Sequence, residues 1–140
     1  MKSFARAAVL LGATVWCLAI VAAPLFHWGL VYAFFSTICH QLPARSWHLY
    51  GEPLGLCIRC TSISFGFLAG LLVLHRPRVR WFTVSVVITL VEWLVAFMVF
   101  DSDILRALSG ILLGASAAPI VRSGVEEMFM RRVRTAYESM

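Results

Sequence analysis

Three of the four cysteines and two of the four histidines lie in one short stretch, from Cys39 to Cys60. The stretch ends in Cys57-Ile58-Arg59-Cys60, where two residues separate the thiols and an apolar run follows. At the start of a helix both thiols can point at one atom, and the helix N-terminus and the Arg59 charge favour the thiolate form. Because thiolates bind metals and also attack disulfides, the stretch predicts one of two chemistries.

Metal binding would use four ligands from this stretch: Cys39, His40, Cys57 and Cys60. Sixteen residues separate His40 from Cys57, which is close to the spacing of zinc sites, and a Cys₃His set completes a tetrahedron. Adjacent residues rarely bind one ion, so His48, His27 or an open position are alternatives to His40. The loop has too few apolar residues to fold alone, so a bound metal would contribute to its folding. We expect zinc or another transition metal here.

Redox chemistry is the alternative use of the same thiols. Cys57 and Cys60 would form a reversible dithiol, and Cys39 would act as the resolving thiol. Cys17 lies inside the first apolar run and does not obviously supply a fourth thiol. A structural disulfide with one free thiol is the third interpretation.

The rest of the chain is too apolar to be covered by its own polar residues. It is 61% hydrophobic and 14% charged, whereas soluble domains are nearer half apolar and a quarter charged. Four apolar runs have about the length that crosses a hydrocarbon core: residues 7–23, 54–74, 81–100 and 104–121. No run alternates with a period of two, and a backbone in lipid must bond internally. We therefore predict an all-α integral membrane protein, a single membrane domain over residues 1–140 with four transmembrane helices.

Three segments outside this core pattern need separate interpretation. The first run follows Lys2 and Arg6 as in a secretory signal, but Pro24 opposes cleavage, so we expect a retained helix. The aromatic segment 24–38 predicts an interfacial or bent helix, because Trp and Tyr collect at membrane surfaces. The cytoplasmic tail, 122–140, is either a basic amphipathic helix on the anionic leaflet or a solvated tail.

The distribution of basic residues predicts the orientation. Nine of the 12 Lys and Arg residues lie before the first run, between the second and third, or after the fourth. By the positive-inside rule both termini are cytoplasmic, and the cysteine stretch faces outward. The basic residues fall between apolar runs and not in one patch, so the expected partner is the lipid bilayer and not nucleic acid.

Four charged residues are candidate cofactor-binding residues near the cysteines: Arg45, Arg59, Glu92 and Arg106. Glu92 lies in the third run, where an unpaired carboxylate costs several kcal/mol. We predict that it pairs with Arg59 or Arg106 beneath the cysteines, as a structural pair, a proton path or an anchor of the site. Arg45 could contact an anionic lipid head group, a quinone carbonyl or Glu52.

Small residues recur every four positions in two of the predicted helices. The stripes are Ser62, Gly66 and Gly70 in the second helix, and Gly110, Gly114 and Ala118 in the fourth. Such stripes let helices approach closely in lipid. We expect them inside the bundle, against each other or other helices; the alternative is a homo-oligomer or a larger membrane complex formed through them.

The signature residues resemble those of a known family. They are Cys39-His40-Gln41, Pro43, Arg45-Ser46, Gly51, Cys57-Ile58-Arg59-Cys60-Thr61, Gly66 and Gly70. Together they resemble an uncharacterised family of small prokaryotic membrane proteins, the domain-of-unknown-function family two-thousand-eighty-five, over about Phe35 to Ala117. Glu92, Arg106 and Gly110 also match it, while Ser62 replaces a usual glycine. The resemblance implies a polytopic protein of a prokaryotic cytoplasmic (inner) membrane with the cysteines as its site, and it implies no particular activity.

The leading hypothesis is an integral membrane protein with an extracytoplasmic Cys/His metal site, most simply for zinc, in a structural or metal-handling role. The layout of four helices with an outward Cys-x-x-Cys also resembles the quinone-coupled disulfide oxidases and the vitamin K epoxide reductase class, which use two cysteine pairs. A membrane thiol–disulfide oxidoreductase, with quinone as a possible cofactor, is therefore the enzymatic alternative. An accessory subunit of a larger membrane complex is the third.

Overall fold

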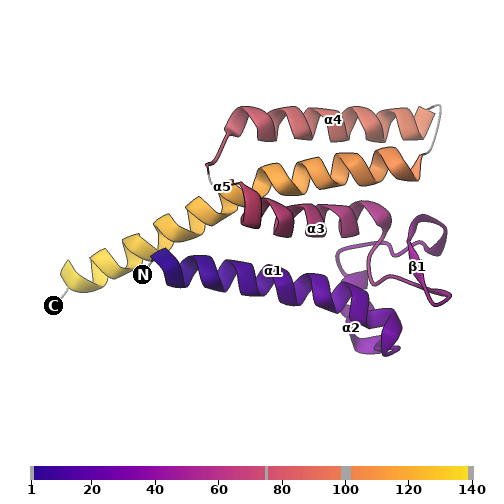
Figure 1. The fold of residues 1–140 in the computed structure, drawn as a ribbon, viewed down its shortest axis with the longest axis horizontal. Coiled ribbons are helices and arrows are strands. Elements are labelled where there is room, and N and C mark those ends of the chain that lie inside the picture. The colour runs from indigo at the N-terminus through magenta and orange to yellow at the C-terminus, as the bar shows by residue number, and fades with distance from the viewer. Residues whose placement is uncertain (1, 75, 99–101, 139–140) are drawn as a thin grey trace.

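The computed structural model consists almost wholly of helices, with a small two-stranded element at one end (Figure 1). It describes residues 2–74, 76–98 and 102–138. The elements are α1 (Lys2–Leu25), α2 (Gly29–Ser36), the 3₁₀ helix η1 (Pro43–Arg45), β1 (His48–Leu49), β2 (Glu52–Pro53), α3 (Ile58–Val73), α4 (Val79–Met98) and α5 (Asp103–Glu138). The predicted helical class is therefore confirmed. Asp101, expected with Asp103 in a turn before the last helix, lies outside the described residues.

Helices α3 and α5 form the closest pair in the molecule and run parallel. A Cβ placed on Gly66 would collide with the Ile111 backbone, and one on Gly114 would collide with the backbone of Ile63. A Cβ on Gly70 would lie 2.5 Å from the Ala115 carbonyl oxygen. The two small-residue stripes thus face each other, as one interpretation of the sequence predicts.

This packing covers both stripes within one chain, where each lies against the other. The homo-oligomer or larger membrane complex stays a prediction, and the stripes as packed here are not open to a second protein.

The other long helices flank this pair. Figure 1 shows α4 as the outer layer beyond α5, with α1 on the opposite side of α3. Three helices within the described residues are long and apolar enough to cross a membrane: Ser3–Leu25, Val79–Met98 and Asp103–Arg131. In α4 only Ser85 is buried, so this helix presents apolar side chains outward on nearly all sides, as a lipid-facing helix does.

Helix α3 is shorter than the sequence predicts. It has 16 residues, or about 24 Å at 1.5 Å per residue, because residues 54–57 are not helical: the chain bends at Gly55 and Leu56 and is extended at Cys57. Gly55 lies beneath the Phe35 ring, where a Cβ would come within 2.8 Å of the ring. Its N–H donates to the Ile20 carbonyl at 3.3 Å, so the chain is held against α1 before α3 begins.

The aromatic segment forms a separate short helix packed on α1. Helix α1 continues through Pro24 and ends at Leu25, and His27 turns the chain with a φ of 48°. Helix α2 then folds back so that Trp16 meets Phe34 and Phe35 edge-on, with ring centroids 5.9 and 5.1 Å apart. Segment 24–38 is thus a turn followed by a packed helix.

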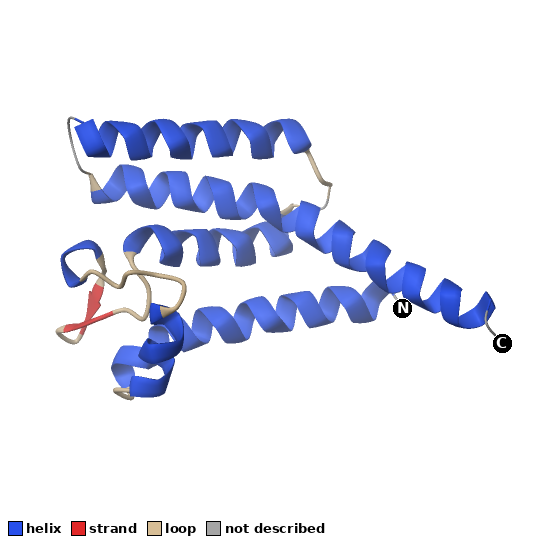
Figure 2. Ribbon diagram, turned by 180° about the vertical axis from the view of Figure 1, so that it is seen from behind, coloured by secondary structure: helices blue, strands red, loops and turns tan. Residues whose placement is uncertain are grey.

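Helix α5 continues past the predicted end of the fourth helix at residue 121. Figure 2 shows its C-terminal half extending beyond the other helices. The Arg6 Nε lies 2.7 Å from Glu126 Oε1, and the Phe4 and Phe129 rings lie 6.2 Å apart. The tail is therefore helical to Glu138, as one of the two interpretations predicts, and the start of α1 packs on it. Its contact with the anionic leaflet stays a prediction.

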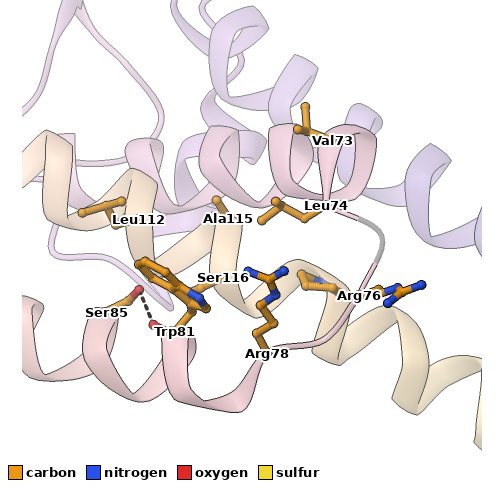
Figure 3. Close-up of a pocket in the computed structure, with 10 residues that line it drawn as sticks. Val73, Leu74, Arg76, Arg78, Trp81, Ser85, Leu112, Ala115 and Ser116 are labelled. Carbon is orange, nitrogen blue, oxygen red and sulfur yellow. Dashed lines mark hydrogen bonds between the residues drawn. The ribbon is translucent and has the colours of Figure 1, made fainter.

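A cavity of about 490 Å³ opens between α3, α4 and α5 at the end away from the strands (Figure 3). Its walls are mostly apolar and include Leu74, Leu112 and Pro119. Arg76 and Arg78, from the α3–α4 connection, also line it, and the Arg78 side chain extends toward it. Trp81 lies beside Arg78 in this view. Basic and aromatic side chains thus gather at this end of the bundle.

Two glycines of α5 give a matched test of the α3–α5 contact. Alanine is about 1 kcal/mol better than glycine in a helix, and Gly124 has open space around it. Gly124→Ala should therefore raise the unfolding midpoint in detergent or leave it unchanged. Gly114→Ala should lower it by the equivalent of about 1–3 kcal/mol, because its methyl overlaps α3. Similar shifts in the two variants would contradict the packing described here.

Candidate functional site

The structure brings three cysteines together from two separate segments. Cys57 is the N-cap residue of α3 and Cys60 lies in its first turn, while Cys39 follows α2. Their sulfur atoms all lie within 4.8 Å of one another. The Cys57 N–H also donates to Cys39 Sγ at 3.4 Å. The loop half and the helix half of the motif therefore form one group.

The three cysteines pack against a small apolar core. Cys39 is buried together with Ile20, Phe35 and Leu56, and Cys57 and Cys60 pack against this cluster as half-buried residues. All four cysteines of the chain are free thiols, so the structural-disulfide interpretation does not describe this structure. Cys17 is buried in α1, where it donates to the Ser64 carbonyl.

Gln41 holds the loop in place, and sequence reasoning gave it no role. Its amide Nε2 donates to the Tyr32 carbonyl at 3.0 Å and to the Gly55 carbonyl at 2.7 Å. The Tyr32 hydroxyl in turn donates to the Pro53 carbonyl at 2.5 Å. These bonds join α2, the loop and the segment before Cys57. The sequence signal was its place in the Cys39-His40-Gln41 part of the family signature, which marks the residue without assigning it a contact.

The predicted fourth ligand, His40, is not brought into the group. It is exposed, and the only cluster of potential metal ligands found among the described residues is the three cysteines. His27 and His48 are exposed as well. Of the four predicted ligands the structure thus gathers three, and it leaves one side of the sulfur triangle without a protein ligand from the described residues.

The environment of Cys57 stabilises its thiolate. The pKa of Cys57 is lowered to about 5, chiefly by a hydrogen bond from the Cys60 thiol. Burial of Cys57 opposes this shift. Hydrogen bonds from the Cys60 amide, the Cys39 thiol and the Arg59 amide add to it. These amides belong to the first turn of α3, where backbone N–H groups have no partner within the helix. Cys57 is therefore held as a thiolate, which is the form that binds metal and also the form that attacks disulfides.

The predicted pairing of Glu92 is confirmed. Arg59 Nη2 lies 2.6 Å from Glu92 Oε2, and the Glu92 side chain is only 8% exposed. The Ser109 hydroxyl also donates to Glu92, at 3.3 Å. The other predicted partner, Arg106, instead contacts Asp103 at 3.0 Å. The buried carboxylate thus ties α4 to α3 and α5 near the cysteines.

The part of the chain that matches a known protein family contains the residues described above. A family model described as a predicted membrane protein, DUF2085, matches residues 39–120. The chain belongs to this family. The DUF2085 segment begins at Cys39 and includes the three grouped cysteines, together with Arg45, Arg59, Glu92 and Arg106.

A curated relative carries no assigned activity. An uncharacterized protein of Methanocaldococcus jannaschii is 34% identical over 77 residues, which cover 46% of this chain and 49% of the relative. The chain therefore spans about half the length of that relative. No solved structure matches the chain.

The low pKa of Cys57 predicts its pH-dependent reactivity. In reduced, chelator-treated protein, alkylation of Cys57 should rise with a midpoint near pH 5, because the thiolate predominates above that pH. Cys60→Ala removes the donated hydrogen bond, so the midpoint should move toward the ordinary thiol value of about 8.5. Peptide mass spectrometry separates Cys57 from the other thiols. A wild-type midpoint near 8.5 would show that the contact with Cys60 does not stabilise the thiolate.

Proposed function

We propose that this DUF2085 protein is a multi-pass membrane protein that binds one transition-metal ion, most simply zinc, through Cys39, Cys57 and Cys60. The observation that carries the proposal is the convergence of three free sulfur atoms within 4.8 Å of one another. Thiolate ligands select soft or borderline ions such as zinc and copper(I).

The geometry fits such an ion after a small contraction. Zinc–sulfur bonds of about 2.3 Å in a tetrahedron place sulfur atoms about 3.8 Å apart. The three sulfurs therefore need to move inward by about 1 Å or less. Cys57 and Cys60 are attached to the rigid start of α3, so Cys39 and its loop would make most of this movement.

Three ligands support metal handling over a purely structural role. Structural zinc sites are closed by four protein ligands, whereas sites that exchange ligands keep an open position. His40 is exposed and could swing in to close the site, or a small molecule could take that place. In either case the ion would join the loop after α2 to α3, so metal binding would stabilise the fold.

The enzymatic alternative is a membrane thiol–disulfide oxidoreductase, and the low pKa of Cys57 favours it. Cys57 and Cys60 would give two electrons and two protons to an oxidant such as a quinone. The products would be one disulfide and one quinol. Cys39 lies close enough to act as the resolving thiol.

We further propose that α1, α3, α4 and α5 all cross a prokaryotic cytoplasmic membrane, with both termini cytoplasmic. Helix α3 is short, and the non-helical residues 54–57 precede it on the outer side. The opposite end of the bundle carries Arg76 and Arg78 beside Trp81 (Figure 3), which is the residue pattern of a cytoplasmic membrane surface. The cysteines would then face the oxidising side.

Elemental analysis with thiol counting tests the metal proposal. Protein purified in detergent without chelator should carry about one zinc per chain, with Cys57 and Cys60 reduced. Cys39→Ala should lose most of this metal, because two thiolates bind less tightly than three. Cys17→Ala is the control, since Cys17 is buried in α1 apart from the group, and its metal content should equal that of the wild type. Absence of metal together with a Cys57–Cys60 disulfide would reject the proposal and support the oxidoreductase.

Labelling with a membrane-impermeant thiol reagent tests the orientation. In chelator-treated intact cells the reagent should reach Cys57 without disruption of the membrane. In a chain whose four cysteines are replaced by alanine, a single Arg78→Cys thiol at the other end should react only after the cytoplasmic side is opened. The reverse pattern would invert the proposed topology and leave the metal site unaffected.

A further inference from the structure

A second cavity is lined by three arginines, one of which, Arg59, lies between Cys57 and Cys60 in the sequence. It has a volume of about 80 Å³, and its lining residues are Arg45, Arg59, Trp93, Ala96, Phe97 and Arg106. The arginines come from η1, α3 and α5, and the other three residues come from α4. Four elements therefore meet around a space the size of a small polyatomic group.

The fold positions these side chains firmly. Because α3 and α5 run parallel, their N-terminal ends lie together, and Arg59 and Arg106 both belong to first turns. Arg106 is only 5% exposed and its Nη1 is oriented by Asp103. The Arg59 Nη2 is oriented by Glu92. Two of the three guanidinium groups are thus fixed by carboxylates before anything enters the cavity.

The charges around the cavity favour an anion. Three guanidinium groups line it, and two of them pair with one carboxylate each, Arg59 with Glu92 and Arg106 with Asp103. Arginine presents only hydrogen-bond donors, so a group that enters the cavity must accept hydrogen bonds.

We propose that this arginine cavity binds the phosphate group of an anionic ligand. Planar guanidinium forks match phosphate oxygens, and phosphate offers enough oxygens to meet donors from three directions. The N-termini of α3 and α5 add positive potential from the same side. Carboxylates present only two oxygens and leave one arginine less well matched.

The phosphate can come from a lipid head group or from free phosphate. Phe97 is 77% exposed and Trp93 is 56% exposed, and both lie on α4, the helix with the most lipid-facing surface. Their side chains border the cavity, so a head group could enter from the bilayer while its acyl chains stay along α4. Free phosphate would enter past exposed Arg45.

Arg45→Gln is the decisive variant, because Arg45 is exposed on η1 and its loss should not unfold the helices. Inorganic phosphate, titrated by calorimetry into detergent-purified wild-type protein, should bind. The affinity should fall at least tenfold in Arg45→Gln and be partly restored in Arg45→Lys. Arg76→Gln, at the other end of the bundle, is the matched control and should bind like the wild type.

Competition with lipid distinguishes the two sources. Displacement of bound phosphate by phosphatidylglycerol in nanodiscs, dependent on Arg45, would assign the cavity to a lipid head group. Phosphate binding without displacement would assign it to free phosphate. No binding of either, or equal binding in Arg45→Gln, would overturn the proposal. Zinc content measured on the same samples separates this result from the fate of the metal site.

Discussion

The backbone contact between α3 and α5 is the constraint on which the rest of the structure depends. In lipid there is little hydrophobic drive to bring helices together, so close van der Waals packing must supply the association. Gly66 and Gly114 allow each helix to rest directly on the backbone of the other. This contact fixes the relative height of the two helices. It thereby sets which side chains meet at their N-terminal ends, where the cysteines, Arg59 and Arg106 are found.

The polar end of the bundle then depends on a second, smaller set of contacts. Gln41 bonds α2 to the segment before α3, and Phe35 fills the space over Gly55. Without these contacts Cys39 would lie on a loop of unspecified position. With them, a largely apolar chain brings three thiols together at the end of the bundle that also carries three guanidinium groups. Under the two proposals, this end of the bundle would bind a soft cation and an oxyanion.

The features that could be predicted from the sequence are those that depend on residue periodicity or on the cost of burying a charge. Spacing of four indicated the facing stripes, and the cost of a lone carboxylate in an apolar helix indicated the Arg59–Glu92 pair. Patterns of this kind do not specify loop geometry. The non-helical residues 54–57, the return of α2 along Trp16 and the outward placement of His40 follow from left-handed turns at His27 and Gln41 and from the Phe35 ring over Gly55. No local rule selects these contacts from the many that the residues allow.

The parallel arrangement of α3 and α5 has a consequence for the order of assembly. All three grouped cysteines have been synthesised once residue 60 is made, together with α1 and α2, on which they rest. Arg106 is added 46 residues later (106 minus 60), after α4 has brought the chain back to the same end. The thiol site can therefore form in a nascent chain that has no arginine cavity. A metal ion captured at that stage would already hold the N-terminal half in shape while α4 and α5 are inserted against it.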